Sequence, residues 1–191
     1  MDKPEKIALY GGTFDPIHMG HLLTGYDIME KLGYDRVIYI PDNIPVHKKA
    51  SLSKSADRLK MVKMSVQGIK GFDWSDIEIK RGGYSYTYNT VMEMKKNHDV
   101  KYGIIFGDDL LGGINKWKKI GELQNICELV CLKRNNKSIN DTGLKIKFFE
   151  NRVMEISSTE IRGRIANGLP IKGMVTPEVM NYISRKKLYR I

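Results

Sequence analysis

Two histidines follow a pair of glycines near the start of the chain, in the segment GGTFDPIHMGHL. Gly11 and Gly12 allow a ligand to approach the backbone closely, and the spacing of His18 and His21 puts both on one face of a helical turn. A helix N-terminus offers amide donors and a partial positive charge to an anion, and that anion would stabilise an imidazolium. These residues in this order therefore predict a site for an anion.

Other interpretations of this segment stay open. Asp15, directly before Pro16, fits a helix cap, or a turn leading into a helix, better than it fits a catalytic group. Zinc is a weaker alternative, because no third ligand lies near the histidines. One histidine alone would most often be a packed or surface residue, but the pair beside two glycines makes that reading less favourable. No Gly-x-Gly-x-x-Gly or Walker motif occurs in the sequence.

The elements that must hold this segment alternate between strands and helices. Short apolar or alternating runs predict strands at residues 6–10, 36–40, 74–80, 102–106, 129–133 and 146–150. Apolar residues at helical spacing predict helices at residues 18–32, 56–67 and 87–97. In the second helix the expected buried residues are Leu59, Val62, Met64 and Val66. The alternation predicts an α/β fold with a mainly parallel sheet, in which ligands bind beyond the carboxyl ends of the strands.

Two more helix starts are marked near the end of the chain. Ser157, with glutamate three residues later, fits a capping box, and Thr176 before proline fits a cap with proline at the first helical position. We expect a single domain of residues 1–191, with a C-terminal helical part from about residue 157 to 191. The polar stretch 133–143 is only a weak candidate for a domain boundary.

The net charge is strongly positive and unevenly distributed. Lys and Arg number 32 against 22 Asp and Glu, a net charge of +10, and residues 101–191 hold 17 of the basic and 9 of the acidic side chains. This excess predicts a negatively charged partner, although composition alone does not separate a nucleotide from a nucleic acid. The sequence assigns no role to the basic tail from Arg185 to Arg190.

Composition also bears on the compartment. No apolar run approaches the ~18–20 residues of a membrane-spanning helix, and no signal h-region fits before Asp15. Cys127 and Cys131 are four positions apart, and two residues at this spacing on one strand would have their α-carbons ~13 Å apart, too far for a disulfide. We therefore expect two buried thiols, no membrane partner and a location in the reducing cytoplasm.

The motifs resemble those of the nucleotidyltransferase superfamily. The segment from His18 to His21 is similar to its His-x-Gly-His signature, and ISSTEIR at 156–162 is similar to its second signature. Further stretches resemble bacterial nicotinate-nucleotide adenylyltransferases, namely IPVHKK, DRLKM, GGYSYTYNT, FGDDLL with Trp117 after it, and TPEVMNYI. They cover nearly the whole chain in the expected order. The resemblance implies a Rossmann-like, doubly wound sheet with flanking helices.

The resemblance also implies roles for individual residues. The implied catalytic residues are His18, His21 and Arg162. The implied ATP-binding residues are Gly11, Gly12, Thr13, Phe14, His18, His21, Gly107, Asp109, Ser158, Thr159 and Arg162. The implied residues for nicotinate mononucleotide are Lys48, Thr87 and Trp117. Mg²⁺ would be bound mainly through the phosphates of ATP, without dedicated metal ligands in the protein.

Three of these residues also have a purely structural interpretation. A guanidinium early in a helix opposes the helix dipole, so a nearby triphosphate explains Arg162 better than a solvated surface does in this context. Trp117 would stack on a pyridine ring, but partial burial in the core is about equally favoured. Asp109 could accept hydrogen bonds from a ribose or cap a helix.

The implied activity is transfer of AMP from ATP to nicotinate mononucleotide in NAD biosynthesis. The nearest rival is phosphopantetheine adenylyltransferase of coenzyme A biosynthesis, which shares the outer signatures but lacks the SYT stretch and the Gly-x-Asp stretch with its tryptophan. A basic nucleic-acid-binding protein is less favoured, because aromatic residues do not interleave with basic ones. We expect ATP and nicotinate mononucleotide as partners, no nucleic acid, and leave a homo-oligomer open.

Three positions depart from the pattern of these enzymes. Val46 stands where a second proline is frequent, and Tyr84 stands where proline commonly precedes SYT. Asn89 stands where aspartate commonly follows. These changes concern loop geometry and recognition of the pyridine ring more than the chemistry of transfer.

Overall fold

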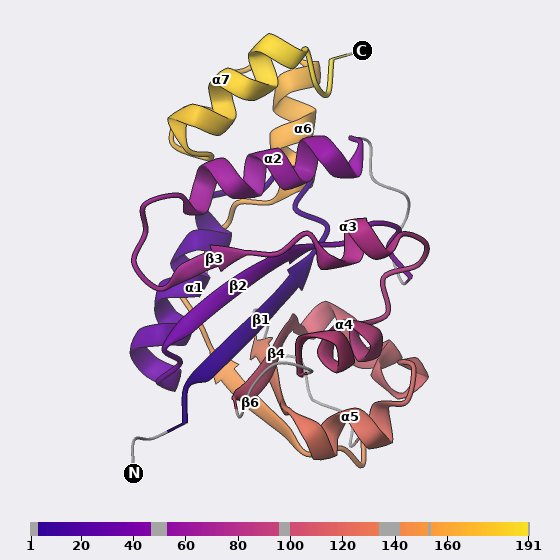
Figure 1. Ribbon diagram of the computed structural model, residues 1–191. Coiled ribbons are helices and arrows are strands. Elements are labelled where there is room, and N and C mark those ends of the chain that lie inside the picture. Colours follow the sequence, from indigo (N-terminus) through magenta and orange to yellow (C-terminus); the bar gives the residue numbers. More distant parts are fainter. Residues whose placement is uncertain (1–3, 47–52, 96–99, 134–141, 153, 191) are drawn as a thin grey trace.

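The computed structural model describes residues 4–46, 53–95, 100–133, 142–152 and 154–190. Six strands in these ranges form one parallel sheet in the order β3-β2-β1-β4-β5-β6 (Figure 1). The strands are β1 (Lys6–Gly12), β2 (Arg36–Pro41), β3 (Phe72–Trp74), β4 (Lys101–Gly107), β5 (Glu128–Lys133) and β6 (Ile146–Glu150). Because β1 pairs with β2 on one side and with β4 on the other, the strand order reverses there. The predicted Rossmann-like, doubly wound sheet is confirmed.

Helices cover both faces of the sheet (Figure 1). They are α1 (Met19–Leu32), α2 (Ser55–Val66), α3 (Ile77–Arg81), α4 (Thr87–Met94), α5 (Ile120–Ile126), α6 (Ser158–Ala166), α7 (Pro177–Lys186) and the 3₁₀ helix η2 (Asp108–Lys116). Side chains of α1, α2, α6 and α7 join one hydrophobic cluster with Tyr10, whereas those of α4, α5 and η2 join a second cluster with Leu9. No helix within the described ranges has the length and apolar character needed to cross a bilayer.

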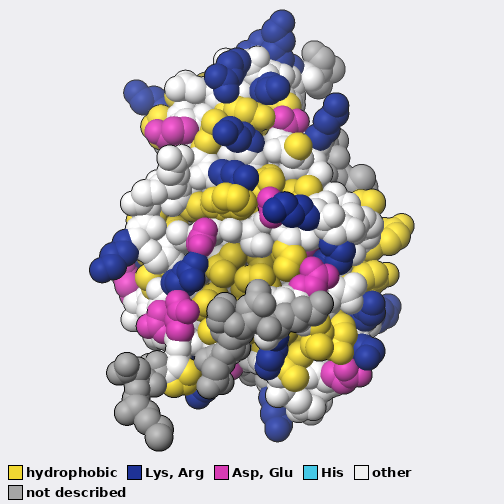
Figure 2. Space-filling view, in the orientation of Figure 1, with side chains coloured by type: hydrophobic (Ala, Val, Ile, Leu, Met, Phe, Trp, Pro, Cys, Tyr) yellow, Lys and Arg dark blue, Asp and Glu magenta, His cyan; other side chains and the backbone are white. Residues whose placement is uncertain are grey.

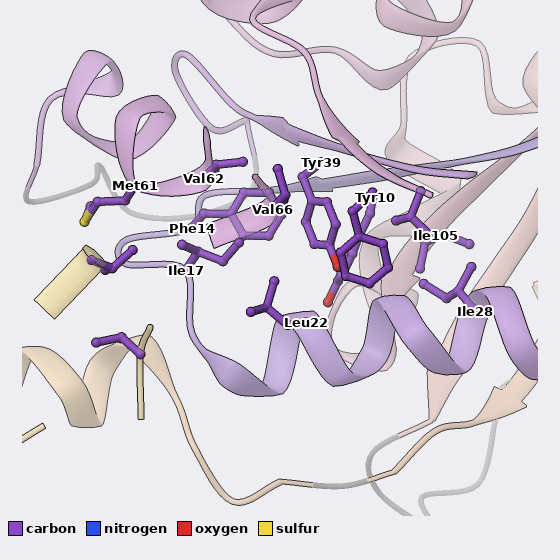
Figure 3. Packing of buried hydrophobic residues seen from close by; sticks show 14 of the residues in the cluster. Tyr10, Phe14, Ile17, Leu22, Ile28, Tyr39, Met61, Val62, Val66 and Ile105 are labelled. Carbon is purple, nitrogen blue, oxygen red and sulfur yellow. The ribbon is translucent and has the colours of Figure 1, made fainter. Parts of the chain in front are cut away.

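The first cluster anchors the loop that follows β1. Figure 3 shows the Tyr10 and Tyr39 rings close to α1, with Phe14 and Ile17 of the loop beside α2. The ring centroids of Tyr10 and Phe14 are 5.7 Å apart in an edge-to-face arrangement. Phe14 and Ile17 are both buried. The loop that carries the histidines is therefore held by core packing on its way into α1.

The predicted starts of the last two helices are confirmed. Ser157 is the N-cap of α6, and its Oγ accepts a hydrogen bond of 3.1 Å from the backbone N–H of Glu160. Thr176 is the N-cap of α7, and its Oγ1 accepts one of 3.4 Å from the backbone N–H of Val179. Each cap satisfies an amide that the helix itself leaves without a partner.

The predicted strand at 74–80 is wrong. β3 ends at Trp74, and α3 begins at Ile77. Glu78, rather than the isoleucines on either side, is the buried residue of α3, and its carboxylate accepts a hydrogen bond from Thr90 Oγ1 at 2.5 Å. The alternation of polar and apolar residues predicts a strand with the isoleucines buried, whereas the structure buries the glutamate between them in a short helix. The short helices η2 and α5 were not predicted.

The buried face of α2 also differs from the predicted one. Its buried residues are Arg58, Met61, Val62, Ser65 and Val66. Of the apolar residues expected there, Leu59 and Met64 are only half-buried. The guanidinium of Arg58 occupies a core position that apolar periodicity reserves for a hydrophobic side chain.

The two cysteines lie in different elements. Cys127 is the C-cap of α5, and Cys131 lies in β5. Both are free thiols; Cys131 is buried and Cys127 is half-buried. Burial raises the pKa of each thiol to about 12, so both stay protonated at neutral pH.

Candidate active site

A cavity of about 540 Å³ opens where the carboxyl ends of β1 and β4 meet. Its walls come from the loops after these strands, the start of α4, η2 and the start of α6. The predicted site residues that line it are Gly11, Gly12, Thr13, Phe14, His18, His21, Thr87, Gly107, Asp109, Trp117, Ser158, Thr159 and Arg162. Lys48, the remaining predicted residue, lies outside the described residues. Segments far apart in the sequence thus converge on one cavity.

The two histidines lie against each other at the start of α1. Their ring centroids are 3.7 Å apart, and the ring planes are inclined by 31°. The backbone N–H of His18, the N-cap residue, donates to Nδ1 of His21 at 3.2 Å, which puts the proton of a neutral His21 on Nε2. Two imidazolium charges this close repel each other, so both rings can be positive only beside an anion. The geometry suits a contact with phosphate.

His18, not Asp15, is the N-cap of α1, so a capping role for Asp15 is wrong, whereas the alternative of a turn leading into the helix is confirmed at Asp15 and Pro16. The Asp15 side chain is buried, and its Oδ1 accepts hydrogen bonds from Ser53 Oγ and, at 2.8 Å, from Tyr189 OH. Its backbone carbonyl accepts a bond of 2.7 Å from Arg162 Nη1. Asp15 therefore joins the loop after β1 to the approach to α2, to α6 and to the C-terminal tail.

The start of α6 is tied to the same loop. Ser158 Oγ donates to the carbonyl of Pro16 at 2.8 Å, beside the bond from Arg162 to Asp15. Arg162 Nη2 donates to Thr159 Oγ1 at 3.1 Å. These two bonds fix the guanidinium at the cavity wall and leave further N–H groups of its fork for an anion. The two sequence signatures thus form one wall.

Another part of the wall is aromatic. Trp117 is half-buried and contacts Phe106, with ring centroids 5.4 Å apart and planes inclined by 60°. Tyr86 is the N-cap of α4 and also lines the cavity, as does Thr87. Trp117 therefore packs against the core with one part of its surface and lines the cavity with another. A flat, electron-poor ring could stack on such a wall.

The model of the cytidylyltransferase-like family matches residues 9–164. The chain belongs to the cytidylyltransferase-like family. A relative from Clostridium novyi (strain NT), named as a probable nicotinate-nucleotide adenylyltransferase, is 36% identical over 97% of this chain and 100% of its own length. A relative of the same name from Bacillus licheniformis is 37% identical over 96% of this chain and 98% of its own. The predicted resemblance is confirmed.

Solved structures share the fold. Plasmodium falciparum nicotinic acid mononucleotide adenylyltransferase complexed with NaAD superposes with a TM-score of 0.79 at 21% identity, covering 97% of both chains. The same enzyme complexed with APC gives a TM-score of 0.78 at 22% identity, again over 97% of both chains. At these identities the likeness supports the fold, in agreement with the observed sheet.

No role was predicted for Arg58, although it lies in DRLKM, one of the stretches that carry the resemblance stated above. Arg58 is 0% exposed, and its Nη1 donates to the Thr13 carbonyl at 2.7 Å and to Asp42 Oδ1 at 2.8 Å. Thr13 Oγ1 in turn donates to Asp42 Oδ2 at 2.8 Å. This buried network joins the loops after β1 and β2. The only signal was an arginine at a position with the helical period of the core.

A second unpredicted network supports the start of α4. Glu78 lines the cavity and accepts its hydrogen bond from Thr90, while Ser85 Oγ accepts one of 2.8 Å from the backbone N–H of Asn43. Burial raises the pKa of the Glu78 carboxyl above its ordinary value, although hydrogen bonds from Thr90 and Ser85 and the charge of Arg81 oppose the shift. The network fixes Ser85 and the residues after it against the loop that follows β2.

The C-terminal tail reaches the site through Tyr189. Its ring is packed against the first hydrophobic cluster, and its hydroxyl lies 3.3 Å from Ser53 Oγ as well as bonding Asp15. Burial raises the pKa of the Tyr189 phenol, so this hydroxyl stays a donor at neutral pH. The basic side chains of this region remain at the surface, where Figure 2 shows Lys and Arg gathered over the end of the molecule formed by α6 and α7.

Proposed function

We propose that this protein transfers the adenylyl group of ATP to nicotinate mononucleotide, giving nicotinate adenine dinucleotide and pyrophosphate. One observation carries the proposal: the same cavity is lined by His18, His21 and Arg162 and by the aromatic wall at Trp117. Donors for a triphosphate and a surface for a pyridine ring are thus available together. The names of the relatives support nicotinate mononucleotide over phosphopantetheine as the acceptor.

The reaction needs no nucleophile from the protein. The phosphate of nicotinate mononucleotide has a second pKa of about 6, as other phosphate monoesters do, and is largely ionised at neutral pH. One of its oxygens attacks the α-phosphorus of ATP and forms a new P–O bond. The bond from the α-phosphorus to the bridging oxygen breaks, and pyrophosphate leaves with that electron pair. Catalysis then rests on in-line alignment and on stabilisation of negative charge.

The proposed roles at the phosphate side follow from the geometry of the β1 loop and α6. His18 and His21 would donate hydrogen bonds to the phosphates and offset the charge that builds up during transfer. Arg162 would bind the triphosphate with the N–H groups not used by Asp15 and Thr159. Both positions are fixed in advance by the buried contacts of the loop, which is what stabilisation of a transition state requires.

The proposed ATP site continues along the end of β4. A Cβ on Gly107 would lie 2.5 Å from Asp109 Oδ1, so a larger residue there would displace that carboxylate from its present position. Asp109, at the cavity wall, would accept hydrogen bonds from ribose hydroxyls. Trp117 would stack on the pyridine ring, and the start of α4 at Thr87 would receive its carboxylate.

We further propose that Mg²⁺ accompanies ATP. The described residues hold no group of three His, Cys, Asp or Glu side chains placed to bind a metal, so phosphate oxygens would supply most of its ligands. When bound, the ion would offset the repulsion between ATP and the incoming phosphate. The cytoplasmic location, the absence of nucleic-acid and membrane partners and a homo-oligomeric state stay predictions.

Release of pyrophosphate from ATP with three acceptors tests the proposal. The acceptors are nicotinate mononucleotide, nicotinamide mononucleotide and phosphopantetheine, each added to the purified full chain with Mg²⁺. We expect the highest kcat/KM with nicotinate mononucleotide. Release with phosphopantetheine alone would overturn the proposed acceptor, and release with none of the three would overturn the proposed activity.

A further inference from the structure

A lysine stands at the rim of the aromatic part of the cavity. Lys118 follows Trp117 and lines the cavity, and its Nζ lies 5.1 Å from the centroid of the Tyr86 ring. Tyr86 is the N-cap of α4, so the ammonium group lies beside the first turn of that helix. Two sources of positive potential, an ammonium and a helix N-terminus, therefore meet at this end of the cavity.

The charge of Lys118 is not neutralised by the partner that orients it. Its Nζ donates a hydrogen bond of 3.0 Å to Oδ1 of Asn89, an uncharged amide. The carboxylates that line the cavity are Asp15, Asp42, Glu78 and Asp109. Among the described residues none of these, nor any other acidic side chain, forms an ion pair with Lys118. The amide thus fixes the position of the ammonium and leaves its full charge available.

We infer that Lys118, held in place by Asn89, is a specificity-determining residue that favours an acceptor with a carboxylate on its pyridine ring over one with a carboxamide. This inference rests on the proposed function. The two acceptors share the phosphate, the ribose and the pyridinium ring, and differ in the ring substituent, which is an anionic carboxylate in one and a neutral carboxamide in the other. An ammonium at the aromatic wall attracts the carboxylate and gains little from the neutral amide.

Asn89 itself offers a sharp test, because an aspartate there would neutralise Lys118 without disturbing the helix. Asn89 is the third residue of α4, and an acidic side chain in the first turn of a helix is favourable for its stability. An Asn89→Asp variant should therefore stay folded and place a competing carboxylate on Nζ. A loss of selectivity in this variant could not be ascribed to a weakened helix.

The experiment measures kcat/KM of the full chain for nicotinate and nicotinamide mononucleotide and takes their ratio. Because the exposed ammonium is screened by water, we expect Lys118→Met to lower the ratio about 3- to 5-fold, the upper range for exposed ion pairs. Asn89→Asp should also lower the ratio, whereas Lys118→Arg, which keeps the positive charge, should leave the ratio close to that of the unaltered protein. Added salt should lower the ratio of the unaltered protein and hardly change that of Lys118→Met.

The matched control is Lys116→Met, which removes the same charge from an exposed lysine that does not line the cavity. Its ratio should equal that of the unaltered protein. An unchanged ratio in Lys118→Met, or an equal fall in Lys116→Met, would overturn the inference while the proposed activity stands. If the unaltered protein releases no pyrophosphate with either mononucleotide, the proposed function itself fails.

Discussion

The imidazoles of His18 and His21 are the side chains on which the proposed transfer depends most. Their rings lie 3.7 Å apart at the start of α1, and the backbone of His18 already fixes the Nδ1 atom of His21. A triphosphate beside them would receive two donors whose positions do not need to change during the reaction. Donors that are oriented in advance contribute most to stabilising a transition state.

Replacing His18 should therefore lower kcat and leave the protein folded. We expect His18→Ala to lower kcat by roughly 10²–10³, the loss typical of one transition-state donor. Steady-state kinetics of pyrophosphate release would measure it, with thermal unfolding to show that the variant is folded. A folded His18→Ala protein with near-normal kcat would remove this histidine from the proposed chemistry.

Replacing Trp117 should weaken the binding of nicotinate mononucleotide and hardly change the binding of ATP. Because its ring lines the acceptor side of the cavity, we expect Trp117→Ala to raise KM for nicotinate mononucleotide about tenfold, as loss of a stacking contact of ~1–1.5 kcal/mol predicts, with a small change in KM for ATP. The matched control is Trp74→Ala, since Trp74 of β3 packs under Lys63 and does not line the cavity. Equal losses for both substrates would show that Trp117 serves packing alone.

At the scale of elements, the site depends on contacts that join loops distant in sequence. Arg58 of α2 ties the loop after β1 to the loop after β2, and Asp15 ties the first loop to the C-terminal tail. Both anchors are buried, so their loss leaves polar atoms without partners in the core. Changes in these anchors should therefore alter the site from a distance.

The hydrogen bond from Tyr189 of the C-terminal tail to Asp15 can be removed by deleting a single hydroxyl group. Tyr189→Phe keeps the packed ring but deletes the donor to Asp15, and we expect KM for ATP to rise about 3- to 10-fold, as for the loss of one ordinary intramolecular hydrogen bond of ~1 kcal/mol. The control is Tyr182→Phe in α7, whose hydroxyl bonds Asp57 at 2.7 Å and does not line the cavity. Substrate kinetics of both variants would decide, and an equal effect of the two would argue against a positioning role for Tyr189.

A buried carboxylate holds α1 to the segment between β6 and α6. Asp27 is 0% exposed; burial raises its pKa, but hydrogen bonds from the backbone and side chain of Arg152 and from Lys31 outweigh this and hold the pKa below its ordinary value. Because the pKa is lowered on folding, the ionised carboxylate adds stability above about pH 4, and this is lost as the pH falls further.

We therefore expect Asp27→Asn to lower the free energy of unfolding by about 2 kcal/mol at pH 7, with a smaller difference at pH 3. Denaturant titrations at both pH values would measure it. Glu30→Gln is the control, because this substitution removes the same charge from an exposed position of α1. A difference for Asp27→Asn that does not shrink in acid would contradict the role of its ionised form.

At the scale of the whole molecule, the parallel sheet and the place of the cavity follow from the sequence. The apolar run KIALY predicts the first strand, and the glycines after it predict a loop that can bind a ligand. The helical spacing of the apolar residues beyond His18 predicts the first helix. Parallel strands bring their carboxyl ends to one edge, which predicts where the cavity lies, and the resemblance carried by the two signatures then implies which distant segments meet there.

Buried polar side chains that are hydrogen-bonded to distant partners were not predicted from the sequence. Arg58, Glu78 and the tail residue Tyr189 each take a core or site position through hydrogen bonds to residues that are distant in the chain. Hydrophobic periodicity carries no information on such pairings, because the energy comes from a specific partner and not from burial of apolar area. The misplaced strand at 74–80 has the same origin.

The most direct test of the account follows the α-phosphorus of ATP. The full chain is supplied with nicotinate mononucleotide, Mg²⁺ and ATP radiolabelled at either the α- or the γ-phosphorus, and the products are separated. We predict that the α-label enters nicotinate adenine dinucleotide and that the γ-label leaves as pyrophosphate. A γ-label in the nucleotide product, or no α-label transferred to nicotinate mononucleotide, would contradict it.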